Sequence, residues 1–259
     1  MKDKIDIQNL TDTRKITIDK VGVKNVQYPI IVEDRADRIQ NTIANLDIFV
    51  ELPHQYRGTH MSRFLEVLNH FHTETLINSL PEFLQELRTA LKADAAYVKL
   101  TFPYFIKKVA PVSKIKSLMN YQCVFESSLR DEYCLKIGVE VPITTLCPCS
   151  KEISDFGAHS QRSYVFVSVR YQEFIWLEEI IDLVEAAASS EVYSLLKRVD
   201  EKFVTEKAYQ NPAFVEDVVR EITLKLQNDS RITWFRVESE NLESIHNHNA
   251  FASVERNKR

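Results

Sequence analysis

The most restrictive feature of this sequence is its shortage of glycine. Only four glycines occur in 259 residues, at positions 22, 58, 138 and 157. A dinucleotide-binding fingerprint needs the pattern G-x-G-x-x-G, and a P-loop needs G-x-x-x-x-G-K-[ST]. These glycines are too widely spaced for either motif. A bound nucleotide phosphate must therefore be held by Lys, Arg or His side chains or by ordinary helix N-termini.

Charge and composition narrow the functional class. The chain has 37 acidic and 33 basic residues, a net charge of −4 and a pI near 6.0. Nucleic-acid-binding domains usually have a pI above about 9, so we expect no nucleic-acid partner. Apolar residues make up 44% of the chain, a share typical of folded globular proteins.

The sequence has neither a long apolar run nor an apolar N-terminal segment. Met1–Asp6 is charged, which is unlike a secretory signal, and no run is long enough to span a membrane. We expect a soluble cytoplasmic protein with no membrane partner. Its four cysteines are then reduced and available for metal binding or catalysis.

Hydrophobic periodicity predicts the same order of elements in each half of the chain. In the first half, a strand at 46–53 follows a polar N-terminal arm or peripheral strand, and then come helices at 61–71 and 80–91 and strands at 95–105 and 118–125. In the second half, we expect strands at 134–141 and 165–169, helices at 176–187 and 212–226, and strands at 232–237 and 250–254. Asn211 is the expected cap of the last helix, with Pro212 as its first residue.

This pattern predicts an α+β fold, in which long antiparallel strands carry two helices on one face in each half. The division falls near residue 130, in a short charged turn. It gives an N-terminal arm at 1–40, a first unit at 41–130 and a second unit at 131–259. No Pro-, Gly- or Ser-rich linker marks this boundary, so we expect the halves to share one continuous sheet.

The densest cluster of chemically unusual residues lies between the first two strands of the second half. It holds Cys147, Cys149, Lys151, His159 and Arg162. Thiolate and imidazole are the ligands that Zn²⁺ and similar metals prefer. The cluster lacks the paired halves of an ordinary structural zinc site, and it is also compatible with a strand connection that merely contains cysteines.

A second cluster holds His246 and His248 near the C-terminus. In an extended segment, residues two apart point the same way, so the two rings can face one site. The alternative is that both are ordinary surface histidines.

Two glutamates are further candidates for the site. Glu201 is expected in a loop after the 176–187 helix, and Glu216 one turn into the last helix, at the flank of its apolar stripe. Periodicity alone would single out neither.

Four segments of the chain resemble GTP cyclohydrolase IB, the prokaryotic, metal-dependent form of this enzyme. They are Arg57–Arg63, Cys147–Lys151, Gly157–Ser163 and Glu243–Ala250. The resemblance runs from about residue 40 to the end. It implies a tunnelling fold made of two tandem ββααββ units, and homotetramers with active sites between subunits.

The resemblance also implies roles for single residues. Cys147, His159 and Glu201 match metal ligands, with His246 and His248 close by as catalytic residues. Cys149 matches a catalytic or substrate-contacting thiol, although the roles of the two cysteines can be reversed. Glu216 matches the purine anchor. Because of their charge or their place beside the motifs, further substrate-binding candidates are Lys151, Gln161, Arg162, Arg57 and Arg63.

The implied reaction converts GTP to 7,8-dihydroneopterin triphosphate and formate, through attack of metal-activated water on purine C8. The metal is Zn²⁺, Mn²⁺ or Fe²⁺, with Mn²⁺ prominent in the family. One alternative is another tunnelling-fold enzyme that acts on a purine, pterin or deazapurine, including an NADPH-dependent reductase with a thioimide intermediate. The other is a non-catalytic oligomer with a structural zinc, which should dissociate or unfold when the metal is removed.

Overall fold

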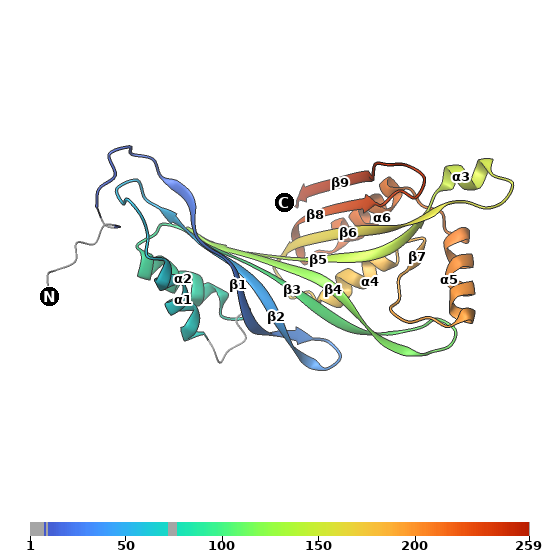
Figure 1. Cartoon of the computed structure of the whole chain (residues 1–259), viewed down its shortest axis with the longest axis horizontal. Helices are drawn as coiled ribbons and strands as arrows, with labels where there is room; N and C mark the ends of the chain where they lie inside the picture. The colour runs from blue at the N-terminus through green and yellow to red at the C-terminus, as the bar shows by residue number, and fades with distance from the viewer. Residues whose placement is uncertain (1–7, 9, 72–76, 259) are drawn as a thin grey trace. The chain divides into compact units, whose positions relative to one another are not determined.

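The computed structural model describes residue 8 and residues 10–71 and 77–258 (Figure 1). The chain divides into two compact bodies. The N-terminal body comprises Met1–Phe102 and Val124–Lys136, and the C-terminal body comprises Pro103–Cys123 and Ile137–Arg259. No helix in the described ranges is long and apolar enough to cross a membrane. The predicted division near residue 130 stays a prediction.

The described strands form one sheet in the order β1-β2-β3-β4-β5-β6-β8-β9, with β7 beside β5. The pairings with a described register are all antiparallel. The strands are β1 Ile18–Asp34, β2 Arg38–Leu52, β3 Ala96–Val109, β4 Lys116–Leu129, β5 Tyr133–Leu146, β6 Ser160–Tyr171, β7 Ser190–Glu191, β8 Ile232–Asn241 and β9 Ala250–Asn257. The α+β class and the antiparallel sheet are confirmed.

Six helices accompany this sheet in the described residues. They are α1 Met61–His70, α2 Leu80–Leu91, α3 Pro148–Ile153, α4 Leu177–Glu185, α5 Arg198–Gln210 and α6 Val215–Asn228. The predicted helices at 61–71, 80–91 and 176–187 are confirmed, as are all the predicted strands. The sequence did not predict α3, α5 or the short strand β7.

In the N-terminal body, α1 and α2 lie against one face of the strands (Figure 1). Alternate residues of β2 and β3 are buried toward these helices, as Ile48, Val50, Val98 and Leu100 show. The intervening Phe49 and Tyr97 are only half-buried and point to the opposite face. The helices leave that second face of the sheet open.

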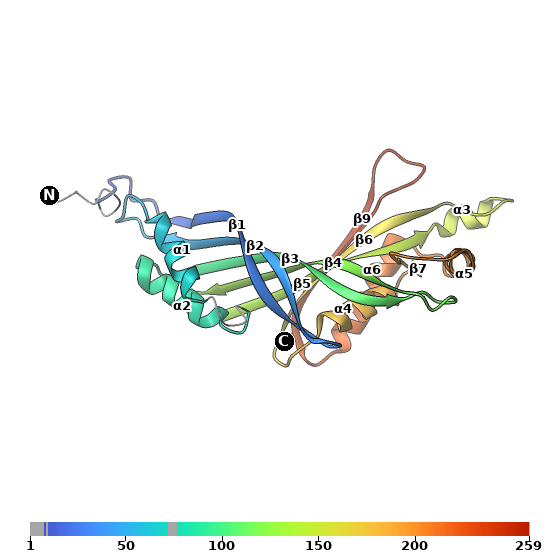
Figure 2. The same cartoon turned by 60° about the horizontal axis from the view of Figure 1, so that its bottom comes forward.

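In the C-terminal body, α4 and α6 cover one face of β5, β6 and β8. The core consists of alternate strand residues and the apolar stripes of the two helices, and its fully buried members include Val139, Val141, Val165, Val167, Val237, Val184, Val218 and Ile222. Figures 1 and 2 both show α3 and α5 at the same end of these strands, and α3 contains most of the Cys147–Lys151 motif.

The last helix begins later than the sequence predicted. Its N-cap is Phe214, whereas Asn211 is the C-cap of α5, so the predicted cap and first residue are wrong. The backbone N–H of Ala213 donates to the carbonyl of Leu146 at 3.1 Å. This bond holds the segment before α6 against the end of β5, and the helix begins only after it.

Candidate active site

The candidate site is built on the loop that joins β5 to β6. Leu146 and Ser160 are the last register partners of this hairpin, and Cys147 N–H donates to the carbonyl of His159 at 3.1 Å. The two predicted metal ligands are therefore neighbours across the hairpin. Cys147 is the N-cap of α3, with Pro148 in the first turn, and its Sγ accepts a hydrogen bond from Ser150 N–H at 3.4 Å.

His159 is oriented by a chain of polar side chains. Its Nδ1 lies 3.0 Å from Gln161 Oε1, and Gln161 Nε2 donates to Thr145 Oγ1 at 2.9 Å. Thr145 in turn pairs with Ser163 at 2.8 Å, and both hydroxyls are buried. Because Gln161 uses its amide nitrogen on Thr145, its oxygen accepts the Nδ1 proton of His159. That tautomer leaves the Nε2 lone pair available for a ligand.

The loop between β8 and β9 approaches the same histidine. Ser244 Oγ lies 3.2 Å from Nδ1 of His159, and Leu242 N–H donates to the carbonyl of Arg162 at 2.9 Å. Further along this loop, the rings of His246 and His248 stack with centroids 5.2 Å apart. Both rings are exposed. The structure thus brings the two sequence clusters to one end of the β5–β6 hairpin.

The two cysteines of the first motif differ in exposure. Cys149 is exposed in the first turn of α3, whereas Cys147 is half-buried at the cap. The other two cysteines lie in strands. Cys123 on β4 is buried, and burial together with the charge of Glu178 raises the pKa of its thiol. Cys134 on β5 is half-buried.

Lys151 links α3 to α5. Its Nζ donates to the carbonyl of Tyr209 at 2.6 Å and lies 4.5 Å from the centre of the Tyr209 ring. These two contacts use the ammonium group of Lys151 within the fold. They favour a positioning role for Lys151 over the phosphate contact expected from its charge.

Glu201 lies in the first turn of α5, so the prediction of a loop at this position is wrong. The helix was missed because Asp200 and Ala208 are its only buried residues, which leaves no apolar stripe to detect. Tyr209, the contact of Lys151, is eight residues further along α5, which corresponds to about 12 Å of helix. Within the described ranges, no three His, Cys, Asp or Glu side chains gather closely enough to hold a metal ion. Glu201 therefore does not join Cys147 and His159 in this structure, and its role as a ligand stays a prediction.

The start of α5 is fixed by Asp200, which sequence reasoning missed. Its buried carboxylate accepts hydrogen bonds from the backbone N–H groups of Val112, Ser113 and Lys197 and from the Ser113 hydroxyl. Burial by itself would raise the pKa of Asp200, but these hydrogen bonds lower it well below the ordinary value. The helix start is thereby tied to the turn between β3 and β4.

Glu216 lies in the first turn of α6 and is exposed. The Ala213–Leu146 hydrogen bond holds the start of this segment beside the residue that precedes Cys147. The chain thus brings Glu216 to the same end of β5 as the cysteine motif.

Arg162 is exposed on β6 and lines a cleft of about 470 Å³. The cleft also contains Val192, Tyr193 and Ser194, from the segment after β7. A buried ion pair fixes that segment, because Lys108 Nζ contacts Glu185 Oε1 at 2.5 Å and the Val192 carbonyl at 2.8 Å.

The pKa values of several groups in and around this ion pair are raised. Burial raises the pKa of Glu185 in spite of the opposing charge of Lys108, and Tyr121 donates to the same carboxylate at 2.8 Å. Burial also raises the pKa of Tyr193 to about 12. The phenol of Tyr193 therefore stays protonated at the wall of the Arg162 cleft.

Arg57 and Arg63 belong to the N-terminal body, whereas the other candidates belong to the C-terminal body. Arg63 Nη1 donates to the carbonyl of Ala90 at 3.1 Å, which joins α1 to the end of α2. Arg57 is exposed, and its backbone N–H donates to the carbonyl of Leu10 at 2.9 Å. Their assignment to substrate binding stays a prediction.

Sequence reasoning missed the residues that orient the site. Thr145 and Ser163 are hydroxyl residues at inward positions of two apolar strands, a pattern that signals a buried polar contact. Ser244 and Tyr209 carried no such signal, because their partners are distant in the sequence.

Comparison with known proteins shows the fold and the family. Uricase from Arthrobacter globiformis superposes with a TM-score of 0.53 at 8% identity and 93% coverage of both chains. Urate oxidase from Bacillus sp. TB-90 superposes with a TM-score of 0.55 at 9% identity, covering 93% of this chain and 100% of that one. At such low identity the likeness concerns the fold alone, which is the tunnelling fold.

Similarity in sequence is much closer. GTP cyclohydrolase FolE2 of Geotalea uraniireducens (strain Rf4) is 55% identical over 254 residues, which is 98% of this chain and 94% of that protein. GTP cyclohydrolase FolE2 of Syntrophus aciditrophicus (strain SB) is 57% identical over 253 residues, with 97% and 99% coverage. Residues 5–252 match the family model of type I GTP cyclohydrolase folE2. The chain therefore belongs to the type I GTP cyclohydrolase folE2 family, and it is a hydrolase with GTP cyclohydrolase activity.

Proposed function

We propose that this chain converts GTP to 7,8-dihydroneopterin triphosphate and formate, the first step of tetrahydrofolate-type pterin synthesis, at the end of the β5–β6 hairpin. One observation carries the assignment of the site. Cys147 and His159 are hydrogen-bonded neighbours across the hairpin, and the loop with His246 and His248 contacts His159 through Ser244. The reaction needs an activated water and proton donors, and this arrangement supports a site that holds both kinds of group.

The donor set fits a divalent metal ion. Cys147 supplies a sulfur, and the hydrogen bond to Gln161 leaves Nε2 of His159 as the imidazole donor. Thiolate with imidazole suits Zn²⁺, and Mn²⁺ or Fe²⁺ is accepted when a carboxylate such as Glu201 completes the set. When bound, such an ion lowers the pKa of a coordinated water from roughly 16 to about 7.

His246 and His248 are the proposed proton donors. Cleavage of the imidazole ring of the purine leaves nitrogen atoms that must take up protons, and a positioned imidazole is the side chain best suited to this near neutral pH. General acid catalysis of this kind contributes roughly 10²–10⁴-fold to a rate. Cys149, exposed one residue beyond Pro148, is the proposed thiol that contacts the substrate.

Glu216 and Arg162 are the proposed binding groups. The two oxygens of a carboxylate match the parallel N–H donors of guanine N1 and the 2-amino group, in charge-assisted hydrogen bonds. Arg162 lies in the Gly157–Ser163 segment and is exposed in the cleft, and its guanidinium can pair with a phosphate in a bidentate manner.

Assembly and location complete the proposal. We place the enzyme in the cytoplasm as a homotetramer with active sites between subunits. The surface of α5 supports a subunit contact, because Val199, Phe203 and Tyr209 are large apolar side chains and are 53%, 42% and 42% exposed.

An anaerobic incubation with GTP and Mn²⁺, with and without EDTA, tests the function. After oxidation, fluorescent neopterin species should appear only where metal is free to bind. His246→Ala should lose most of this product, whereas His54→Ala, which changes an exposed histidine of the N-terminal body, should not. A folded, metal-loaded wild type that forms no neopterin would refute the proposal.

A further inference from the structure

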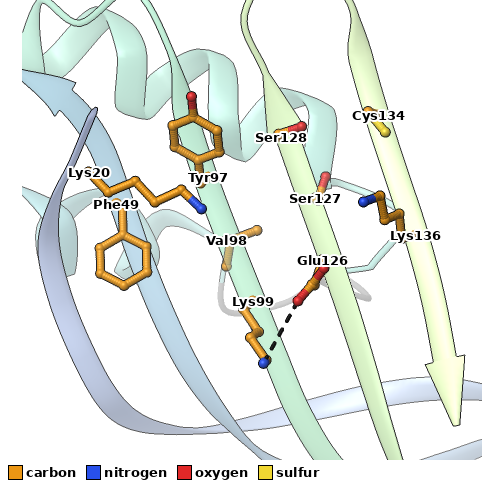
Figure 3. A pocket seen from close by; sticks show the side chains of 10 residues that line it. All are labelled: Lys20, Phe49, Tyr97, Val98, Lys99, Glu126, Ser127, Ser128, Cys134 and Lys136. Atoms are coloured by element: carbon orange, nitrogen blue, oxygen red, sulfur yellow. Dashed lines mark ion pairs between the residues drawn. The ribbon is translucent and has the colours of Figure 1, made fainter. Parts of the chain in front are cut away.

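The open face of the sheet in the N-terminal body carries a pocket with no role in the proposed reaction. Phe49 of β2 is the register partner of Gly22 of β1 on one side and of Tyr97 of β3 on the other. Both rings point away from the helices, as the burial of Ile48 and Val98 requires. A cavity of about 280 Å³ lies on this face (Figure 3).

Position 22, the register partner of Phe49, requires glycine. A Cβ there would collide with the backbone oxygen of Ile48, so no other residue fits without a backbone shift. The row of side chains that contains Phe49 and Tyr97 therefore ends at Gly22. Lys20 extends over this row, and its Nζ lies 4.7 Å from the centre of the Tyr97 ring. An ammonium over an aromatic face is favourable, and the contact holds the charge of Lys20 at the pocket.

The pocket is positive although the chain is acidic. Its charged lining residues are Lys20, Lys99, Lys136 and Glu126, a balance of +2 in a chain whose net charge is −4. Lys20 and Lys136 direct their ammonium groups toward each other from opposite sides of the pocket (Figure 3). Ser128 adds a hydroxyl to the lining.

Lys99 is a third cation that an anion can recruit. Its Nζ lies 3.8 Å from Glu126 Oε1, and the two side chains are 47% and 51% exposed. Exposed ion pairs of this kind contribute about 0–1 kcal/mol, so a doubly charged ligand can compete with Glu126 for Lys99.

We propose that this pocket binds a phosphate-bearing small molecule. The phosphate lies between Lys20 and Lys136, whose ammonium groups form charge-assisted hydrogen bonds with its oxygens. The rings of Phe49 and Tyr97 provide an aromatic wall for a planar group, where the ligand has one. A nucleotide and an inorganic polyphosphate share the recognised chemistry, and only the nucleotide uses both parts of the pocket.

Calorimetric titration with tripolyphosphate, and separately with ATP, tests the proposal on the full chain. ATP lacks the guanine edge that Glu216 is proposed to recognise. The double variant Lys20→Ala/Lys136→Ala should bind the phosphate-bearing probe at least about tenfold more weakly than the wild type. Lys24→Ala is the matched control, because it removes an exposed β1 lysine that pairs with Asp47 and does not line the pocket. Equal affinity of the wild type and the double variant would overturn the proposal.

Cys134 provides a second readout, because this half-buried thiol lines the same pocket. Alkylation by iodoacetamide, followed by peptide mass mapping, should slow at Cys134 when the probe is bound. If ATP protects Cys134 more strongly than tripolyphosphate does, and this difference disappears in Phe49→Ala, the site binds nucleotides. If the two probes protect Cys134 equally, the site recognises the phosphate groups alone. Absence of protection by either probe would contradict the proposal. Neopterin formation in the same preparations tests the proposed function separately.

Discussion

Nδ1 of His159 lies 3.0 Å from Oε1 of Gln161, and the amide of Gln161 is itself fixed because its Nε2 donates to Thr145. Gln161 was expected to bind substrate, but it is 8% exposed and both ends of its amide are used within the fold. These contacts favour a role in setting the tautomer and direction of the imidazole.

Gln161→Leu tests that role. The variant removes the amide acceptor of the Nδ1 proton and leaves only the longer contact with Ser244, so we expect His159 to become a weaker ligand. Loss of an outer hydrogen bond to a metal-binding histidine typically costs 10–100-fold, and we expect a decrease of about this size in metal affinity, measured by competition with a chelator. Gln27→Leu, at an exposed position of β1, is the control. Unchanged metal affinity in a folded Gln161→Leu variant would show that Gln161 does not position His159.

Lys151→Met tests the link between α3 and α5. The variant keeps the length of the side chain and loses the hydrogen bond to the Tyr209 carbonyl, so we expect a loss of about 1 kcal/mol in the free energy of unfolding. Denaturant unfolding measures this loss, and steady-state kinetics should show little change in KM for GTP. A large rise in KM with unchanged stability would instead assign Lys151 to the triphosphate.

Arg162→Ala tests the proposed phosphate contact. Because Arg162 is exposed in the cleft, its removal should leave folding intact and raise KM for GTP by roughly tenfold, the expected loss for a hydrogen bond to a charged group. Arg220→Ala, an exposed position on α6, is the matched control. If KM stays at the wild-type value, Arg162 does not bind the substrate.

Asp200 predicts an acid-dependent loss of stability. Its pKa is lowered in the folded state, so its contribution is complete above the ordinary pKa of 3.8 and is lost as the pH falls below it. Urea unfolding should give the wild type a lower midpoint at pH 3.5 than at pH 7. Asp200→Asn should have a lower midpoint than the wild type at pH 7 and a smaller decrease on acidification. Identical pH dependence in the two proteins would contradict this assignment.

Hydrophobic periodicity predicts much of the fold, and the elements that it does not predict are missed for physical reasons. β2 and β3 were predictable because one face of each is buried, so that the buried Ile48 and Val98 alternate with less buried neighbours. In β1, by contrast, the first twelve residues are exposed or half-buried, and pairing with β2 holds them in place without an apolar pattern. The helix α5, which carries Glu201, was missed because it has few buried residues and therefore shows no apolar stripe.

The candidate site was predictable as a set of motifs and not as an arrangement. Cys147 and His159 become neighbours because they lie where the two strands of a hairpin end, and both strands were predicted from the sequence. The contacts from Lys151 to Tyr209 and from Ser244 to His159 span 58 and 85 residues. They depend on the packing of whole elements, which no local pattern encodes.

Release of labelled formate tests the central claim most directly. GTP carrying carbon-14 at C8 is incubated with the Mn²⁺-loaded enzyme, and labelled formate is measured together with neopterin. The account predicts one labelled formate for each neopterin, abolished by EDTA and by His159→Ala while the variant remains folded. Full formate release by a folded His159→Ala variant would contradict the assignment of the reaction to this hairpin.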